Sequence, residues 1–339
     1  MFFQHLIALQ YLGSKRKLLP FIQNTICNVV GTDLSQTTFC DLFAGTGIVG
    51  RTFKTSVNEV IANDLEYYAY VLNRNYIGNH EAIPDCQRYI DDLNHLPLVH
   101  DGFIFRNYCL GGGTGRQYFS DHNGKKIDTV RQGIESLRKT GTVDDDLYYF
   151  LLASLLESAD TVANITSHYT AFLKHLDPKA QKPLVLAPAH FEANENTHRV
   201  YNENANTLIR HISGDILYLD PPYNSLQYGG DYHLLNTIAL YDDYIPSGKT
   251  GRRVYQRSSW ASRRKVEEEL DDLLAHAHFK YVFLSYSNEG LMSPETIKRI
   301  MSKYGHYDFV STEYKRFKSD KSVHKTNKTT EYIHVLEVR

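Results

Sequence analysis

An aspartate, two prolines and a tyrosine occupy residues 220–223, directly after the apolar run Ile216–Leu219. The run is rich in β-forming residues and predicts a short buried strand. Pro221 and Pro222 would end this strand, because proline cannot donate to a sheet ladder. The result would be a rigid corner at the carboxyl end of a strand, where open α/β sheets bind their ligands. One carboxylate, fixed backbone carbonyls and one aromatic face suit the binding of a flat base that carries an amino group.

The chemistry of adenine explains why these residue types would stand together. Its exocyclic amino nitrogen is a poor nucleophile, because the lone pair is delocalised into the ring. Asp220 and the carbonyl of Pro221 could accept its two N–H bonds and free that lone pair, while Tyr223 stacks on the ring, a contact of roughly 1–3 kcal/mol. The alternative is an ordinary Pro-Pro turn with a surface aspartate, so the interpretation depends on a methyl donor site elsewhere.

A glycine-rich turn at residues 38–47 is the candidate donor site. A strand over about 38–42 runs into the turn, and a helix is expected from about Ile48. Gly45 and Gly47 allow the backbone to turn sharply and to approach a ligand closely. Such a turn is weak evidence alone, and it lacks both the full GxGxxG spacing and the Lys-Ser/Thr of a phosphate loop.

Asp64 closes the next expected strand, Glu59–Asn63. An acidic residue about 20 positions after the glycine turn suits hydrogen bonding to ribose hydroxyls. The alternative is an N-cap for a helix that starts near Glu66, and both roles are compatible. Upstream, Lys15 belongs to a basic turn before a helix expected over about 17–29, which taken alone is typical of a solvated charge cluster.

Four motifs occur along the chain in one order. They are Tyr11–Lys15 (Tyr-Leu-Gly-Ser-Lys), Asp41–Gly47 (Asp-Leu-Phe-Ala-Gly-Thr-Gly), Asn63-Asp64 and Asp220–Tyr223. In this order and over nearly its whole length, the chain resembles the Dam-like, alpha-group DNA adenine methyltransferases. Further segments at 107–131, 158–174, 224–234 and 284–290 resemble restriction-modification members. Several motifs in the correct order are far more specific than any one of them.

The resemblance implies transfer of a methyl group from S-adenosylmethionine (AdoMet) to the amino group of adenine in DNA. It implies catalytic roles for Asp220, Pro221, Pro222 and Tyr223. It implies cofactor contacts from Tyr11, Lys15, Asp41, Ala44, Gly45, Gly47, Asp64 and Asp220. Asn204 is expected at the cofactor's adenine, where the family more often has an acidic residue, because an amide offers both a donor and an acceptor.

Length and composition exclude several classes of protein. The chain has 339 residues, a net charge of −2 and 42% hydrophobic residues, so it can bury the core of one large domain or two. No apolar stretch reaches the about 18 residues of a membrane span, and the start lacks the features of a signal peptide. The four cysteines show no paired spacing, which fits a reducing cytoplasm, and the histidines form no metal-binding motif. We therefore expect no metal and no membrane association.

The expected elements predict an α/β fold. Strands are expected at about 38–42, 59–63, 198–202, 216–220 and 280–286, alternating with helical stretches. This alternation indicates a mostly parallel sheet with helices on both faces, and the resemblance implies that it is a Rossmann-like AdoMet-dependent methyltransferase sheet. The segment 331–338 should add an antiparallel terminal strand. By the resemblance, the chain divides into a methyltransferase domain (1–95 and 191–339) and a target-recognition insert (96–190), in which 146–162 predicts a buried helix.

Basic residues gather at 249–265, where no acidic residue occurs and Tyr255 and Trp260 are interleaved. Basic and aromatic side chains together suit phosphate contacts with added stacking, although a solvated loop is the commoner outcome. The candidate DNA contacts here are Lys249, Arg252, Arg253, Arg257, Arg263 and Arg264. In the insert, Arg116 and Arg131 are further candidates, with a structural ion pair as an equal alternative. A second basic run, 315–328, is expected as a hairpin loop between two terminal strands.

We therefore predict an AdoMet-dependent methyltransferase that flips an adenine out of a specific sequence in double-stranded DNA. It would be the modification half of a restriction-modification system, with a cognate restriction endonuclease that acts on the same site without direct binding as a candidate partner. The alternatives are methylation of the cytosine amino group, of an RNA base or of a protein amide, where such corners usually begin with Ser or Asn. A catalytically silent DNA-binding protein is the alternative of another class, against which Lys15, Asp64 and Asp220 argue.

Overall fold

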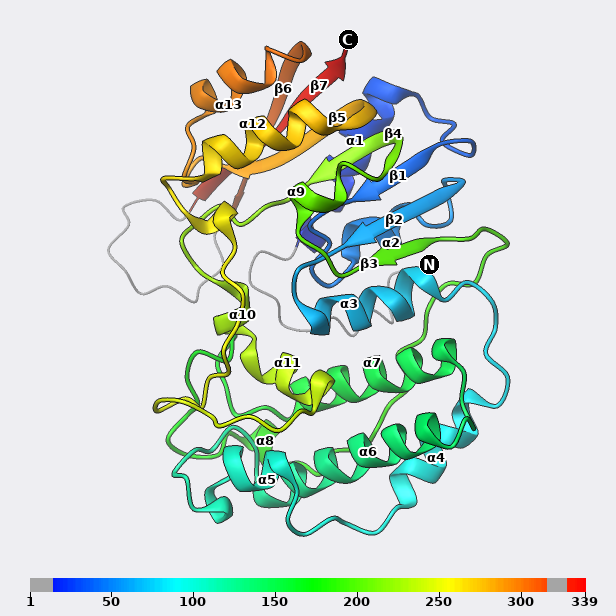
Figure 1. Ribbon diagram of the computed structural model, residues 1–339, viewed down its shortest axis with the longest axis vertical. Coiled ribbons are helices and arrows are strands. Elements are labelled where there is room, and N and C mark those ends of the chain that lie inside the picture. The colour runs from blue at the N-terminus through cyan, green and yellow to red at the C-terminus, as the bar shows by residue number, and fades with distance from the viewer. Residues whose placement is uncertain (1–14, 316–327) are drawn as a thin grey trace. The chain divides into compact units, whose positions relative to one another are not determined.

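The computed structural model describes residues 15–315 and 328–339, which form two compact units (Figure 1). The sheet unit comprises residues 15–65, 194–227 and 256–339, apart from the undescribed stretch, and the helical unit comprises 66–193 and 228–255. Each unit has a hydrophobic core of its own.

A seven-stranded sheet of order β3-β2-β1-β4-β5-β7-β6 forms the centre of the sheet unit. Its strands are β1 (Thr38–Asp41), β2 (Glu59–Asn63), β3 (Arg199–Tyr201), β4 (Ser213–Leu219), β5 (His278–Ser287), β6 (Gly305–Lys315) and β7 (Lys328–Val338). β1 to β5 are parallel to one another, and β7 pairs antiparallel with both β5 and β6. The expected parallel strands and antiparallel terminal strand are confirmed, as are the two terminal strands around the second basic run, of which residues 316–327 lie outside the described residues.

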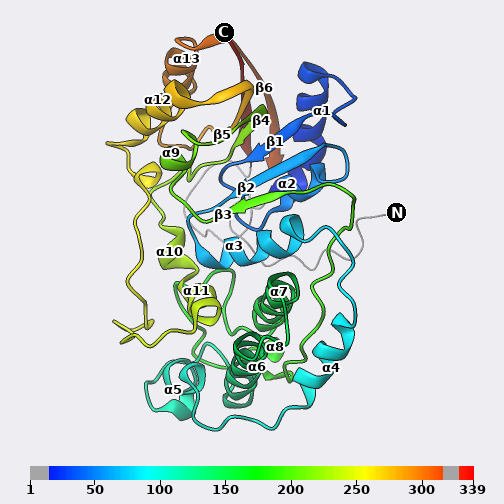
Figure 2. The same ribbon diagram turned by 45° about the vertical axis from the view of Figure 1, so that its right-hand side comes forward.

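Helices cover both faces of this sheet, as Figure 2 shows. They are η1 (Lys15–Leu18), α1 (Leu19–Val30), α2 (Ile48–Phe53), α9 (Ala205–Leu208), η4 (Ser259–Ala261), α12 (Val266–His276) and α13 (Pro294–Met301). On one face, Phe39 of β1 stacks on Phe53 of α2, with ring centroids 4.4 Å apart. On the other face, Cys40 belongs to a core that includes Leu270 and Leu273 of α12. A strand buried on both faces must be apolar throughout, which explains the continuous hydrophobic runs that predicted β1 and β4.

The strand order reverses direction between β1 and β4. From β1 the chain adds β2 and β3 on one side, and later adds β4 and β5 on the other. Asp41, the last residue of β1, pairs with Tyr218 of β4, so the carboxyl ends of these strands are level with each other. Open α/β sheets bind ligands at this point, because the two crossover connections leave in opposite directions there.

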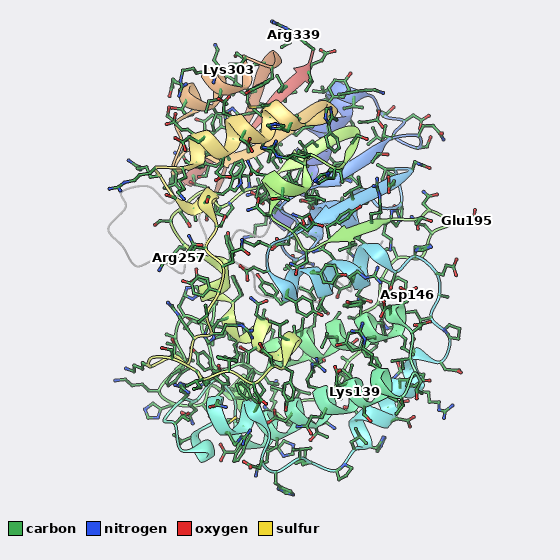
Figure 3. All side chains as sticks on the ribbon, viewed as in Figure 1. Lys139, Asp146, Glu195, Arg257, Lys303 and Arg339 are labelled. Atoms are coloured by element: carbon green, nitrogen blue, oxygen red, sulfur yellow. The ribbon has the colours of Figure 1, made fainter. Side chains whose placement is uncertain are left out.

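The helical unit is built from α3 (Tyr67–Asn73), the π-helix η2 (Arg74–Gly78), α4 (Cys86–His95), α5 (Phe103–Tyr108), η3 (Leu110–Gly112), α6 (Asp121–Lys139), α7 (Asp145–Thr161), α8 (Pro178–Gln181), α10 (Tyr228–Asp231) and α11 (His233–Leu240). The expected buried helix is α7. Lys139 at the end of α6 and Asp146 at the start of α7 are marked in Figure 3. Buried tyrosines, among them Tyr118 and Tyr169, account for much of the core.

The expected insert, 96–190, lies within this helical unit, which also includes residues 66–95 and 228–255. Its role in target recognition stays a prediction. Among the described residues, no helix combines the length and the apolar composition needed to cross a bilayer.

Candidate active site

The glycine turn after β1 is held in place by the end of β2. Gly45 and Gly47 have positive φ angles of 53° and 78°, which other residues rarely adopt. The amide of Ala44 donates to the carbonyl of Asn63 at 2.9 Å, and the amide of Gly47 donates to the carbonyl of Ala44 at 2.8 Å. The turn therefore has a defined shape before α2 begins.

Asp64 supports the same turn through its side chain. Its Oδ2 accepts a hydrogen bond from the amide of Gly45 at 2.8 Å. The alternative that Asp64 caps the next helix is wrong, because α3 has Glu66 at its N-cap position and no side-chain capping bond. The carboxylate is aimed at the glycine turn instead.

Asp41 is the most deeply buried carboxylate at this edge, with 1% of its surface exposed. Its Oδ2 accepts from the amide of Gly50 at 2.9 Å, whereas Oδ1 has no hydrogen-bond partner among the described residues. Burial raises the pKa of Asp41 to about 7, the Gly50 bond opposes the rise, and the charges of Asp220 and Asp64 add to it. Asp41 is thus an acidic group whose charged form would be stabilised by a cationic ligand.

The Asp220 corner follows β4 directly, and Leu219 before it pairs with Leu284 of β5. Pro221 is buried, while Pro222 and Tyr223 are half-buried. The carbonyl of Tyr223 accepts from the amide of Leu291 at 2.9 Å, and its ring packs against the core of the sheet unit. The corner is therefore anchored on both sides, as the proline pair predicted.

Lys15 connects this corner to the last strand. Its ammonium lies 2.9 Å from Oδ1 of Asp220 and 3.0 Å from Oε1 of Glu331 on β7. Although burial opposes its charge, the two carboxylates raise the pKa of Lys15 well above its ordinary value. The interpretation of Lys15 as part of a solvated charge cluster is wrong, because only 7% of its side chain is exposed.

Asp220 remains partly open, with 21% of its side chain exposed. Burial raises the pKa of Asp220 to about 6, Lys15 lowers it, and the Glu331 carboxylate raises it further. Because this pKa lies below 7, the carboxylate is mostly ionised at neutral pH and can accept hydrogen bonds.

The two remaining expected cofactor residues are Asn204 and Tyr11. Asn204 is exposed and caps α9, with its Oδ1 accepting from the amides of Asn206 (2.9 Å) and Thr207 (3.3 Å). Its contact with the cofactor adenine stays a prediction. Tyr11 lies outside the described residues.

The arginines predicted in the insert have structural roles in the helical unit. Arg131 is buried, donates to the carbonyls of Ile238 and Ala239 at 3.1 Å each, and pairs with Glu135 at 3.0 Å. Arg116 donates to the carbonyls of Asn107, Gly248 and Lys249. The contacts of Arg131 favour the structural alternative. The bonds of Arg116 to Gly248 and Lys249 stabilise the turn at 247–252.

The basic stretch 249–265 is divided between the two units. In the helical unit, Arg253 forms a bidentate pair with Asp242, at 3.0 and 2.8 Å, so its charge is already matched. Lys249 is exposed there and Arg252 is half-buried. In the sheet unit, Arg257, which Figure 3 labels, is exposed, as are Arg263 and Arg264.

Glu331 and Ser285 are functional candidates that we did not predict. Ser285 of β5 donates from Oγ to Oε1 of Glu331 at 2.8 Å. The sequence does carry one signal for Glu331. It lies two residues before Ile333 and four before Val335, so it is on the same buried face of β7 as these apolar side chains. A charge in such a position predicts a buried partner, but the sequence does not say that the partner is Lys15.

A family model of D12 class N6 adenine-specific DNA methyltransferases matches residues 11–300. The chain belongs to this family. The resemblance drawn from the four motifs is therefore confirmed, and the protein is an adenine-specific DNA methyltransferase. The alternatives of cytosine, RNA or protein methylation and of a silent DNA-binding protein lose their support.

Curated relatives agree with this assignment. The Type II methyltransferase M.NlaIII of Neisseria lactamica is 57% identical over 332 residues, which cover 97% of this chain and 99% of the relative. The Type II methyltransferase M.CviAII of Paramecium bursaria Chlorella virus 1 is 37% identical, covering 91% of this chain and 92% of its own. M.FokI of Planomicrobium okeanokoites is 35% identical over 97% of this chain, which spans about half (52%) of that longer protein.

Replacing Asp41 by asparagine should stabilise the methyltransferase at alkaline pH. The pKa of Asp41 is about 7 in the folded protein and 3.8 for an ordinary carboxyl group. Between these values the folded state binds a proton that the unfolded chain has released, so the free energy of unfolding falls as the pH rises. We expect Asp41→Asn to exceed the wild type by ~1–3 kcal/mol at about pH 8, with little difference near pH 4, measured by urea unfolding.

Asp215→Asn is the matched control on β4. Although burial opposes it, hydrogen bonds from Lys280 (2.7 Å) and Thr38 (3.0 Å) lower the pKa of Asp215. This stabilisation is present above the ordinary pKa, so the control variant should lose stability at about pH 8. A loss in both variants would contradict the electrostatic account of Asp41.

Proposed function

We propose that the methyltransferase uses AdoMet to methylate the exocyclic amino nitrogen of an adenine flipped out of a specific sequence in double-stranded DNA. The observation that carries this proposal is the adjacency of β1 and β4. The glycine turn follows one of these parallel strands and the Asp220 corner follows the other, so a donor at the turn and a base at the corner would meet at one sheet edge.

The residues after β1 and β2 fit AdoMet. The free Oδ1 of Asp41 suits an ammonium group such as that of the methionine part, and the main chain of Ala44 to Gly47 offers close approach. The carboxylate of Asp64, which accepts from the amide of Gly45 at the glycine turn, is placed to accept ribose hydroxyls as well. The charges of Asp64 and Asp220 both act on Asp41, and the three carboxylates together would favour a sulfonium cation. We expect Tyr11, Lys15 and Asn204 to complete the site.

Asp220 and the carbonyl of Pro221 would accept the two N–H bonds of the target amino group, with Tyr223 stacked on the ring. Bound AdoMet would supply a methyl group on a positively charged sulfur, so that an N–C bond would form as the S–C bond breaks. The amino nitrogen would then release one proton to solvent. The contribution of these residues is orientation and electrostatic stabilisation rather than a covalent intermediate.

The target base must leave the duplex, at a cost of a few kcal/mol. We propose that residues 96–190 of the helical unit carry target recognition and that 1–95 and 191–339 carry donor binding and catalysis. Phosphate contacts would come from Lys249 and Arg252 and from Arg257, Arg263 and Arg264, whereas Arg253 and Arg131 are occupied by carboxylates.

The names of the relatives support a place in a restriction-modification system, since M.NlaIII and M.FokI are described as Type II methyltransferases. We propose that methylation protects host DNA in the cytoplasm from a cognate endonuclease that acts on the same site without direct binding.

Asp220→Ala should strongly slow methyl transfer. The variant loses the acceptor for one amino N–H, and we expect the single-turnover rate to fall by ~10²–10³-fold. The rate is measured with tritiated AdoMet on target DNA, followed by nucleoside analysis for N6-methyladenine. Asp308→Ala, which removes an exposed carboxylate on β6, is the control and should keep the wild-type rate. Undiminished methylation by Asp220→Ala would refute the role of the corner.

The double variant Arg263→Ala/Arg264→Ala should bind DNA more weakly at every salt concentration. If both arginines contact phosphates, the slope of log K against log salt should become shallower by about 2. Arg299→Ala is the control, because Arg299 of α13 already pairs with Glu267 at 2.7 Å. Equal slopes for the double variant and the wild type in a fluorescence anisotropy titration would remove these two residues from the DNA face.

A further inference from the structure

Lys15, Asp220 and Glu331 form a charged cluster, and Glu331 is its least accessible member. Its side chain is 2% exposed, on β7 at the position paired with Ser287 of β5. Its Oε1 receives the Lys15 ammonium at 3.0 Å and the Ser285 hydroxyl at 2.8 Å. Ser285 is the residue of β5 after Leu284, the partner of Leu219, so its small side chain lies between the Asp220 end of β4 and Glu331.

A second buried carboxylate on one ammonium is not explained by stability alone. Removing a charged group from water costs several kcal/mol, which a single buried ion pair often barely repays. Lys15 already has Asp220 at 2.9 Å. Adding Glu331 leaves this group of three with a net negative charge, which favours a cationic ligand but does not stabilise the empty fold.

The two carboxylates differ in access. Asp220 is 21% exposed on its side chain and Glu331 is 2% exposed, so a ligand can reach the first but not the second. Lys15 contacts Oδ1 of Asp220, so the other carboxylate oxygen can accept an amino N–H of the target base without breaking that contact. If Asp220 were the only partner of the buried ammonium, the ammonium would hold the charge of that carboxylate more strongly and weaken it as an acceptor. Glu331 shares the ammonium and so leaves Asp220 the stronger acceptor.

We propose that Glu331 is a positioning residue for methyl transfer: it shares the Lys15 ammonium with Asp220, and so keeps the Asp220 carboxylate in place and a strong acceptor for the amino group of the target adenine. This inference rests on the proposed role of Asp220. Glu331 lies beyond residue 300, where the family match ends, so the match does not assign it.

The charges around Asp220 give the expected pH effect. Lys15, Glu331, Tyr218 and Asp41 interact electrostatically with Asp220 or with its partner Lys15. After burial, Lys15 lowers the pKa of Asp220 and Glu331 raises it. Neutralising Glu331 should therefore lower the pKa of Asp220, tighten its pair with Lys15 and weaken it as an acceptor.

The test compares the full-length wild type with Glu331→Gln and Glu331→Asp. Single-turnover methylation of target DNA is followed from about pH 5 to about pH 8.5, and AdoMet binding is measured by calorimetry. We expect Glu331→Gln to be ~10–100-fold slower, with AdoMet and DNA affinities within about 3-fold of the wild type. The acid limb of its rate profile should move to lower pH. Glu331→Asp keeps the charge, so it should be several-fold faster than Glu331→Gln and keep the wild-type acid limb.

Two results would overturn the inference. One is a wild-type rate and pH profile in Glu331→Gln. The other is a slow Glu331→Gln whose AdoMet affinity and free energy of unfolding fall in parallel while the acid limb stays in place, since that indicates a structural role. If Glu331→Gln does not fold, Glu331→Asp decides: a wild-type acid limb with a reduced rate supports the inference, and a shifted limb contradicts it. Full activity in Asp220→Ala would instead refute the proposed function.

Discussion

One buried ammonium, that of Lys15, holds together three parts of the chain that lie far apart in the sequence. It joins the first described helix, the corner after β4 and the terminal strand β7, through Asp220 and Glu331. The family model matches residues 11–300, whereas Glu331, the third member of this charged cluster, lies beyond them. The last strand of the chain, which lies between β5 and β6 in the sheet, is therefore also part of the proposed active site.

The sheet topology explains why these charges meet where a ligand would bind. β1 is the parallel neighbour of both β2 and β4, so Asp41, Asp64 and Asp220 lie at or just beyond carboxyl ends on the same edge. Burial, together with the charges of nearby carboxylates, raises the pKa values of Asp41 and Asp220, so their ionised forms are unfavourable without a cationic ligand. A cationic donor would stabilise these forms, which makes the site stable in the presence of its ligand rather than in its absence.

Much of this site could be predicted from the sequence because its residues follow directly on strands with clear hydrophobic patterns. The Asp220 corner, the glycine turn and the parallel strand pairing belong to this group, and so does the family. Local patterns were less informative where a side chain chooses between partners. Asp64 is followed by a helix, and capping was a reasonable alternative, but the amide of Gly45 on the neighbouring strand end is the group it binds.

Long-range partners could not be predicted. Arg131 lies in a helix with a polar pattern, and only the fold brings the last carbonyls of α11 to its guanidinium. Glu331 and Lys15 are near opposite ends of the chain, and no spacing rule connects them. The pairing of Arg253 with Asp242 likewise could not be predicted, because the basic stretch that contains Arg253 has no acidic residue. In each case, the sequence indicates a buried or charged residue, and the tertiary structure decides its partner.

A structure of the ternary complex with target DNA and an unreactive analogue of AdoMet tests the central claim most directly. The account predicts that the amino nitrogen of the flipped adenine lies within about 3.2 Å of Asp220 and of the Pro221 carbonyl, with the Lys15 ammonium still on Glu331. An adenine bound at the sheet edge with its amino group on acceptors other than Asp220 and the Pro221 carbonyl would contradict it.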